Sequence, residues 1–248
     1  KSMLRLAHGL AMRGHAVDLV LARAEGPYLA LVPDIVRVVD LKGARVLSSL
    51  PALVGYLRRE QPEALLSSLD YANIVALWAR RLARMPQRVV VNEQNMISLT
   101  SQHSSQWRQR LVPRLVKRFY PWADYIIGNS QGVADDLSRI TGLPGARVQV
   151  IFNPVVTPEL ADKAAACPNH PWFEAGQPPV LLAVGRLTEQ KDFPTLIQAF
   201  AQVRRLQPLR LLILGDGPAR PALEALIGEL QLELDVSLPG FVENPYAY

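Results

Sequence analysis

The sequence predicts an α/β protein made of two Rossmann-like domains, the second of them incomplete in this chain. The first observation behind this prediction is that short apolar runs alternate with amphipathic stretches along almost all of the 248 residues. Apolar runs of about four to eight residues have the length of buried strands in a parallel sheet covered on both faces. The second observation is that the alternation stops in a proline-rich stretch and then starts again. We therefore expect one domain at residues 1–153 and another at residues 154–248.

In the first domain, each element follows from hydrophobic periodicity and from the residues that end it. Residues 1–13 have a helical pattern that stops at Gly14, and residues 16–22 form an apolar strand interrupted only by Asp18. Pro86 ends the third predicted helix. The other predicted elements are a strand at 35–41, a helix at 50–59, a strand at 64–67, a helix at 71–84, a strand at 88–91, a helix at 107–120, a strand at 125–128, a helix at 131–141 and a strand at 148–151.

The second domain begins after a stretch without periodicity. Residues 157–177 are rich in proline, so we expect a linker with a short irregular helix. The alternation then resumes with a strand at 180–184, a helix at 193–206, a strand at 210–214, a helix at 218–230 and a strand at 236–238. Three strands and two helices bury little apolar surface. We therefore expect the second domain to be incomplete here.

The composition excludes several classes of protein. Hydrophobic residues make up 49% and charged residues 20%, which is typical of a soluble globular protein, and the longest apolar runs are shorter than the roughly 20 residues of a membrane-spanning helix. Cys167 is the single cysteine, which excludes an internal disulfide and a cysteine-based metal cluster and favours a reducing cytoplasm. A net charge of +5 favours an anionic partner: nucleic acid, acidic lipid or a phosphate-bearing small molecule.

A candidate phosphate site follows the first strand of the second domain. Gly185 and Arg186 come where the strand ends, and Lys191 lies just before the next helix. Ligands of doubly wound sheets bind at the carboxyl ends of the strands, and the N–H groups at a helix N-terminus favour anions. Two cations there indicate a diphosphate site, although cations on a connecting loop also occur simply as solvated charges. A second glycine loop, Gly215 to Gly217, is by itself typical of any tight strand-to-helix turn.

Taken together, these motifs resemble those of the family-4 retaining glycosyltransferases. The matching segments occur in the family's order and are residues 128–137, 150–155, 185–191, 214–218 and 238–242. The resemblance covers nearly the whole chain. It implies a GT-B architecture, with an acceptor-binding N-terminal domain and a nucleotide-sugar-binding C-terminal domain. It also implies transfer with retained anomeric configuration, without a metal ion and without a cofactor other than the UDP- or GDP-sugar donor.

The resemblance also implies roles for individual residues. Arg186 and Lys191 would hold the donor diphosphate and stabilise the charge on the leaving nucleotide, as a metal does in other transferases. Further donor contacts are expected at Gly185, Gly215, Gly217, Phe241 and Val242, and acceptor-cleft residues are expected to be Glu93, Gln94, Asn129 and Ser130. Relatives often have a histidine where this chain has Gln94, so we expect no catalytic histidine. We interpret His103 as a surface residue.

The chain also departs from the family pattern at both ends. The strand and glycine-rich loop that usually precede the first helix are not found upstream of Lys1. Two glutamates, separated by seven residues, that grip the donor sugar and ribose in the family would fall after Tyr248. We therefore expect this fragment alone to be a poor transferase.

A basic amphipathic helix is predicted at residues 107–120. Residues 94–123 contain no acidic residue, and Trp107, Leu111, Leu115 and Phe119 share one helical face. Pro113 suggests a kink or two shorter helices. Basic helices with aromatic residues bind anionic membranes, but the same apolar face is also suited to packing on a sheet. Both interpretations of the apolar face, packing on the sheet and membrane binding, stay open. We expect a cytoplasmic protein, which membrane binding would hold peripherally on the inner face of the membrane.

The sequence therefore leads us to expect an enzyme of cell-surface polysaccharide or glycoconjugate synthesis. It would transfer a hexose from a nucleotide-diphosphate sugar to a saccharide or lipid-linked acceptor. One alternative is a nucleotide-sugar 2-epimerase, which needs acidic and histidine cleft residues that we do not identify. Another is a catalytically degenerate nucleotide-sugar-binding protein. We do not expect nucleic acid as a partner, because no recognition motif is present.

Overall fold

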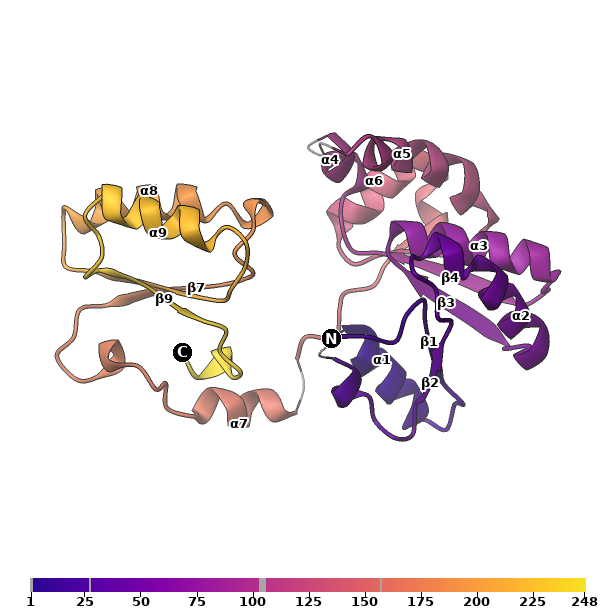
Figure 1. Ribbon diagram of the computed structural model, residues 1–248, viewed down its shortest axis with the longest axis horizontal. Coiled ribbons are helices and arrows are strands. Elements are labelled where there is room, and N and C mark those ends of the chain that lie inside the picture. The colour runs from indigo at the N-terminus through magenta and orange to yellow at the C-terminus, as the bar shows by residue number, and fades with distance from the viewer. Residues whose placement is uncertain (1, 27, 103–105, 157) are drawn as a thin grey trace. The chain divides into compact units, whose positions relative to one another are not determined.

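The computed structural model describes the chain except residues 1, 27, 103–105 and 157, and it divides into two compact units (Figure 1). Unit 1 is Lys1–Val155 and unit 2 is Val156–Tyr248. Each unit has its own hydrophobic core, built from different residues. The division falls close to the boundary expected after Asn153, and each unit is described separately below.

Unit 1 contains two parallel sheets where the sequence led us to expect one. The smaller sheet pairs β1 (Asp18–Leu21) with β2 (Arg37–Asp40). The larger sheet has the strand order β3 (Ala64–Ser68), β4 (Arg88–Glu93), β5 (Tyr125–Gly128) and β6 (Val148–Val150). No hydrogen-bonded ladder joins the two sheets within the described residues, so the expectation of one continuous sheet is wrong.

A charged cluster connects the small sheet to a helix of the larger one. Asp18 and Arg37 face each other across β1 and β2 and form an ion pair. Arg37 also bonds to Glu60, with 2.8 Å between Nη2 and Oε2, and the Tyr56 hydroxyl donates to Asp18 Oδ2 at 2.5 Å. The Arg37 guanidinium lowers the pKa of Asp18. Tyr56 and Glu60 belong to α2, so this cluster orients the small sheet against that helix.

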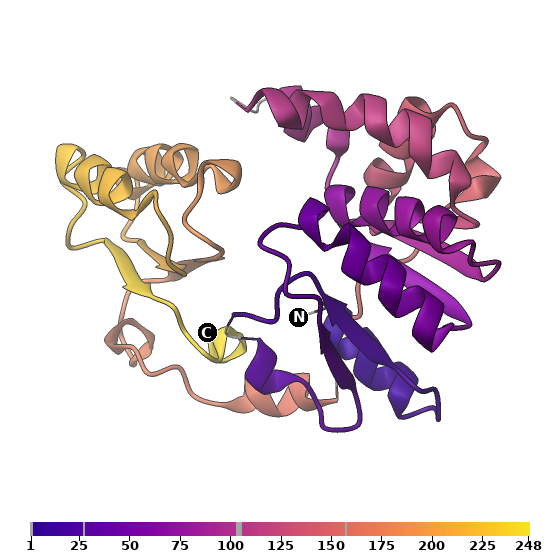
Figure 2. The same ribbon diagram turned by 45° about the vertical axis from the view of Figure 1, so that its right-hand side comes forward.

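The helices of the larger sheet form a row. They are α2 (Leu50–Glu60), α3 (Asp70–Ala83), α4 (Ile97–Gln102), α5 (Trp107–Phe119) and α6 (Gln131–Thr141), while α1 (Ser2–Ala11) precedes the small sheet. Helix α2 packs on α3, α3 on α5, and α5 on α6 (Figure 2). Strands β3 to β6 are neighbours in sequence order, and right-handed crossovers then place the connecting helices on one face. Val89, Val91 and Ile126 are wholly buried, whereas Val90 and Ile127 on the opposite face are half-buried.

Helix α5 differs from its prediction in two ways. It runs without interruption through Pro113, so the two-helix alternative is wrong; packing against α3, α4 and α6 stabilises the helix despite the lost backbone donor. The fully buried side chains are Val112, Val116 and Tyr120, one position further along the helix than the predicted face. Trp107 is 66% exposed and points into solvent.

Unit 2 is a three-stranded parallel sheet with helices on one face. The strands are β7 (Val180–Val184), β8 (Arg210–Leu214) and β9 (Val236–Gly240), in that order. Helices α8 (Phe193–Arg204) and α9 (Arg220–Glu229) lie together over one face of the sheet, and α7 (Glu159–Ala165) lies in the segment on the other side (Figure 1). The core forms between α8, α9 and β8, where Leu211, Ile213 and Ile197 are wholly buried.

In the part of the chain that the structure describes, no helix is long and apolar enough to cross a membrane.

Candidate functional site

The loops at the carboxyl ends of the unit 2 strands are bonded directly to one another. The Gly185 N–H donates to Leu214 O at 2.9 Å, and the Leu187 N–H donates to Asp216 O at 3.0 Å. The third strand joins them, because the Gly215 N–H donates to the carbonyl of Gly240 at 2.8 Å. The loops after β7, β8 and β9 therefore form one connected edge of backbone.

Two glycines of this edge are required by the chain itself. Gly215 has φ +140, and a Cβ built on it would lie 1.9 Å from the carbonyl oxygen of Gly185. A Cβ on Gly217 would lie 2.3 Å from the carbonyl oxygen of Leu187. Neither position accepts a side chain without displacing the neighbouring loop. Loop packing thus accounts for both glycines, and their predicted contact with a donor stays a prediction.

Arg186 and Lys191 are both exposed on the loop between β7 and α8. Neither side chain forms an ion pair or a hydrogen bond with any residue that the structure describes. The methylene groups of Lys191 pass beside Gly185, where a Cβ would come within 3.7 Å of Cδ and Cε. Lys191 ends the short helical turn Glu189–Lys191, and α8 begins at Phe193. The loop therefore presents two uncompensated cations just before a helix N-terminus, an arrangement that favours a phosphate-bearing ligand.

The two remaining predicted donor residues follow β9. Gly240 has φ +92, a conformation that suits glycine, and it turns the chain at the end of the strand. Phe241, directly after it, is 74% exposed, and Val242 is half-buried. An exposed aromatic ring at the carboxyl edge of a parallel sheet offers a stacking surface to a planar ligand.

In unit 1, three of the four predicted acceptor residues gather where β3, β4 and β5 end. Gln94 Nε2 donates to Ser68 Oγ at 3.3 Å, and Asn129 Nδ2 donates to the Gln94 carbonyl at 3.3 Å. Ser130 caps α6, because its hydroxyl accepts a bond from the Val133 N–H at 3.3 Å. Gln94, Asn129 and Ser130 are all half-buried, so a ligand at this edge can reach amide and hydroxyl groups.

Glu93 ends β4 directly before Gln94, but its side chain is buried in the core, so its predicted exposure in the acceptor cleft needs correction. Its side chain is 2% exposed, because the alternation along β4 puts it on the same buried face as Val89 and Val91. The Tyr120 hydroxyl donates to Glu93 Oε1, and Asn73 Nδ2 donates to the same oxygen at 2.9 Å. Burial raises the pKa of Glu93 to about 7. In this geometry Glu93 joins β4 to α3 and to the end of α5.

Sequence reasoning missed Asn73, the residue that holds this network together. Its amide nitrogen also lies 3.0 Å from the Tyr120 hydroxyl and 3.0 Å from the carbonyl of Asn92, and its side chain is wholly buried. The available signal was an asparagine among the apolar positions of the predicted helix at 71–84. Sequence alone does not identify its partner, because Tyr120 is 47 residues away.

His103 lies outside the residues that the structure describes, so its expected surface position is not seen. In the described ranges, no three histidine, cysteine or acidic side chains gather in a way that could hold a metal ion.

Two family models match this chain. Residues 1–158 match the model described as Glycosyltransferase Family 4, and residues 170–248 match the one described as Glycosyl transferases group 1. A curated relative from Campylobacter jejuni, N-acetylgalactosamine-N,N'-diacetylbacillosaminyl-diphospho-undecaprenol 4-alpha-N-acetylgalactosaminyltransferase, is 32% identical over 180 residues. The match covers 73% of this chain and 47% of that relative, so the chain spans about half of its length.

Solved structures share the fold. Sucrose-phosphate synthase from Thermosynechococcus elongatus superposes with a TM-score of 0.74 at 20% identity, covering 98% of this chain and 64% of the other. Anabaena HepE, solved in complex with UDP and glucose, superposes with a TM-score of 0.69 at 21% identity, covering 99% of this chain and 66% of the other.

Two α/β units of parallel strands, with this likeness, define a protein of the GT-B class. The family model matched along residues 1–158 makes the assignment more specific: the chain belongs to glycosyltransferase family 4.

Proposed function

We propose that the protein transfers a hexose from a UDP- or GDP-sugar to a saccharide or lipid-linked acceptor, with retention of configuration and without a metal ion. The acceptor part of the proposal draws on the Campylobacter relative, whose name specifies an undecaprenol-diphosphate-linked saccharide. The donor part draws on HepE, which was solved with UDP and glucose. Such transfers belong to cell-surface polysaccharide or glycoconjugate synthesis.

The observation that carries the proposal is the pair of cations on the loop between β7 and α8. Arg186 and Lys191 are exposed and have no anionic partner among the described residues. During transfer, negative charge develops on the diphosphate as the bond to the anomeric carbon breaks. Fixed cations at that point stabilise the transition state more than the ground state, because the charge is larger there. In the proposed mechanism, the pair thus takes the part that a metal ion plays in other transferases.

Substitution of the two cations tests this role. Arg186→Ala and Lys191→Ala are each expected to lower kcat about 10²- to 10³-fold, the usual loss when one charge-stabilising group is removed. Release of UDP or GDP from the whole protein, supplied with donor and acceptor, measures the rate. Arg205→Ala, at the other end of α8, is the matched control and keeps the wild-type rate.

Two further measurements test the finer parts of the proposal. Activity that persists in excess EDTA supports a metal-independent reaction, and its loss contradicts that part. The anomeric proton of the product, observed by NMR before mutarotation, reports retention or inversion.

Wild-type rates in both alanine variants would contradict the diphosphate role of Arg186 and Lys191. UDP binding without transfer would favour the catalytically degenerate nucleotide-sugar-binding protein.

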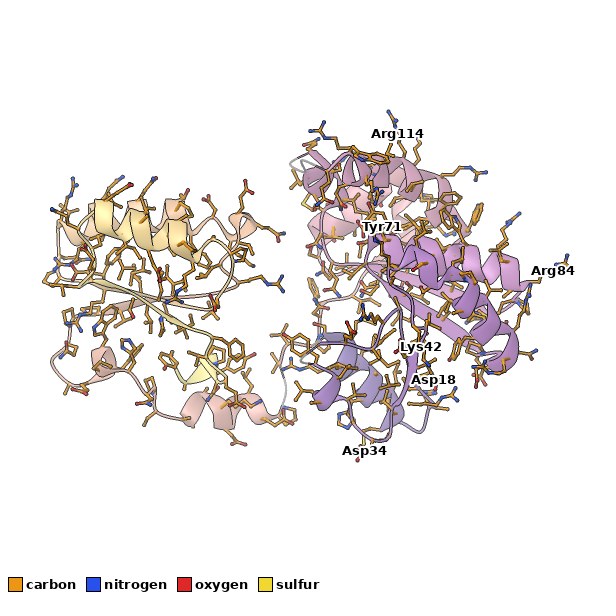
Figure 3. The ribbon with its side chains drawn as sticks, in the orientation of Figure 1. Asp18, Asp34, Lys42, Tyr71, Arg84 and Arg114 are labelled. Atoms are coloured by element: carbon orange, nitrogen blue, oxygen red, sulfur yellow. The ribbon has the colours of Figure 1, made fainter. Side chains whose placement is uncertain are left out.

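We also propose that the protein associates peripherally with an anionic membrane through α5. Arg108, Arg114 and Lys117 are exposed on this helix, and Arg114 points away from the body of unit 1 (Figure 3). Trp107 and Leu111, at 66% and 36% exposed, lie on the same helix and are not used by the core. Cations beside an exposed indole suit the interface of an anionic bilayer. The exposed free Cys167 is in keeping with the reducing cytoplasm on that side of the membrane.

A further inference from the structure

We propose that Leu69 and Tyr71, at the junction of β3 and α3, form the apolar surface on which the sugar ring of the acceptor rests. The inference deepens the proposed transferase function by naming an acceptor subsite and two residues that determine its specificity. Four observations lead to it: the backbone of Leu69, the bonds that hold that backbone, the exposure of both side chains and the polar groups around them.

Leu69 has a backbone conformation that is costly for leucine. Its φ is 81 and its ψ is 145, a region occupied almost only by glycine. A non-glycine residue there costs about 1–3 kcal/mol and persists only where the surrounding structure imposes it. Glycine would relieve this strain, so the side chain at this position calls for a reason other than stability.

The surrounding structure does impose the conformation. The Leu69 N–H donates to the carbonyl of Asn92 at 3.2 Å, and the Leu69 carbonyl accepts the Asn73 N–H at 2.8 Å. The side chain of Asn73 is in turn held by Asn92, Glu93 and Tyr120. The buried network below the junction therefore fixes the direction of the chain at Leu69.

Both apolar side chains face solvent. Leu69 is 52% exposed and Tyr71 is 37% exposed, although they flank the start of a helix whose other face is wholly buried. The Tyr71 hydroxyl lies within electrostatic reach of Asp70 and of Arg108 on α5; burial and Asp70 raise its pKa, and Arg108 opposes them. Gln109 Nε2 donates to Asp70 Oδ2 at 3.1 Å, which ties α5 to this junction.

Polar groups lie at the ends of β3 and of the neighbouring strands β4 and β5. Ser68, the preceding residue, accepts the Gln94 amide at 3.3 Å, and Asn129 bonds to the Gln94 carbonyl. A pyranose ring has apolar C–H faces and a rim of hydroxyl groups. An exposed leucine and a tyrosine ring at the same edge of the sheet as amide and hydroxyl groups match both features, since aromatic and apolar side chains pack on the C–H face while amides bond to the rim.

Three variants of the whole protein test the subsite. Leu69→Gly relieves the strain and removes the apolar contact, and Tyr71→Ala removes the ring at an exposed helical position. Arg84→Gly is the matched control: Arg84 also has a positive φ, of 57, and lies at the other end of α3 from Tyr71 (Figure 3). Binding of p-nitrophenyl N-acetyl-α-galactosaminide is measured by saturation-transfer NMR, and UDP binding is measured in parallel by calorimetry.

We expect Leu69→Gly and Tyr71→Ala each to raise the Kd of the saccharide probe about tenfold. Arg84→Gly keeps the wild-type Kd, all three variants keep the UDP affinity, and the melting temperature of Leu69→Gly is no lower than that of wild type because the strain is relieved. An unchanged probe Kd in both Leu69→Gly and Tyr71→Ala would overturn the subsite, and so would a wild-type protein that does not bind the probe. A protein that binds the probe in this pattern but never binds UDP would instead contradict the proposed transferase and leave the subsite supported.

Discussion

At the scale of single residues, Glu93 shows how burial turns an apparent site residue into a structural one. It sits at the carboxyl end of a central strand, where functional side chains gather, yet its side chain points into the core toward Asn73 and Tyr120. Its carboxyl group is not paired with a cation, so desolvation dominates and raises its pKa to about 7. The same burial raises the pKa of Tyr120.

The raised pKa of Glu93 predicts a specific pH dependence of stability. The folded state holds a proton on Glu93 that the unfolded state has released above its ordinary pKa of 4.5. The stabilisation from this bound proton is thus complete below pH 4.5 and is lost as the pH rises through about 7. The total loss in the free energy of unfolding is about 3 kcal/mol. We expect Glu93→Gln, which mimics the neutral acid, to remove this loss, so that the variant gains stability relative to wild type between pH 5 and pH 8.

Urea unfolding of both proteins at several pH values measures this difference. Glu63→Gln is the control, because Glu63 is exposed and its replacement should leave the pH profile unchanged. A constant stability difference between Glu93→Gln and wild type from pH 5 to pH 8 would contradict the buried neutral acid.

At the scale of secondary-structure elements, α5 has one side that packs into unit 1 and one side that faces solvent. One side packs into the core through Val112 and Val116, and its last turn leads to Tyr120 in the buried network. The other side carries Trp107 and the cations into solvent. Substitutions of Trp107, Arg114 or Lys117 are therefore expected to change membrane binding without changing the fold, because none of these side chains belongs to the core cluster.

We expect the double variant Arg114→Glu and Lys117→Glu to lose affinity for anionic vesicles. Each basic residue near a charged bilayer contributes about 1 kcal/mol, and reversing two of them replaces attraction by repulsion. Sedimentation with vesicles of phosphatidylcholine containing 30% phosphatidylglycerol measures the bound fraction, and pure phosphatidylcholine is the baseline. Arg204 and Arg205 lie on unit 2, and Arg205→Glu, exposed like the reversed pair, should bind as wild type does. Equal binding by wild type and the double variant would contradict the membrane role of α5.

At the scale of the whole molecule, the two units have separate cores and different proposed ligands. The proposed donor cations belong to unit 2, and the proposed acceptor subsite belongs to unit 1. The loops of unit 2 are joined by backbone hydrogen bonds. A nucleotide bound at the proposed site would therefore stabilise these loops before any other part of the chain.

This separation predicts where UDP will slow amide hydrogen exchange. At saturating UDP we expect protection at residues 185–191 and 215–220, since a ligand that binds only the folded state suppresses local opening at its site. Adenosine monophosphate at the same concentration is the control. Protection confined to unit 1 would contradict a donor site on the loops after β7 and β8.

The local pattern of the sequence was enough to predict most elements and their order. Gly142 ends α6 as a left-handed cap, and apolar runs such as residues 210–214 became buried strands, because capping and periodicity act over a few residues. The ordered motifs from residue 128 to residue 242 predicted the family, which the family models confirm. The position of Arg186 and Lys191 between a strand and a helix also followed from the sequence, because it is a local property, whereas their role toward a donor stays a prediction.

Tertiary structure alone decided the features that depend on distant residues. Glu93 is buried because Asn73 and Tyr120, 20 and 27 residues away, close over it, and no local signal records that contact. The helices that pack on α5 determine which of its sides faces solvent. The pairing of the strands determines that unit 1 has two separate sheets. The strained backbone of Leu69 follows from the same buried network. Periodicity reports which residues share a face, whereas the contacts of the folded chain determine what that face meets.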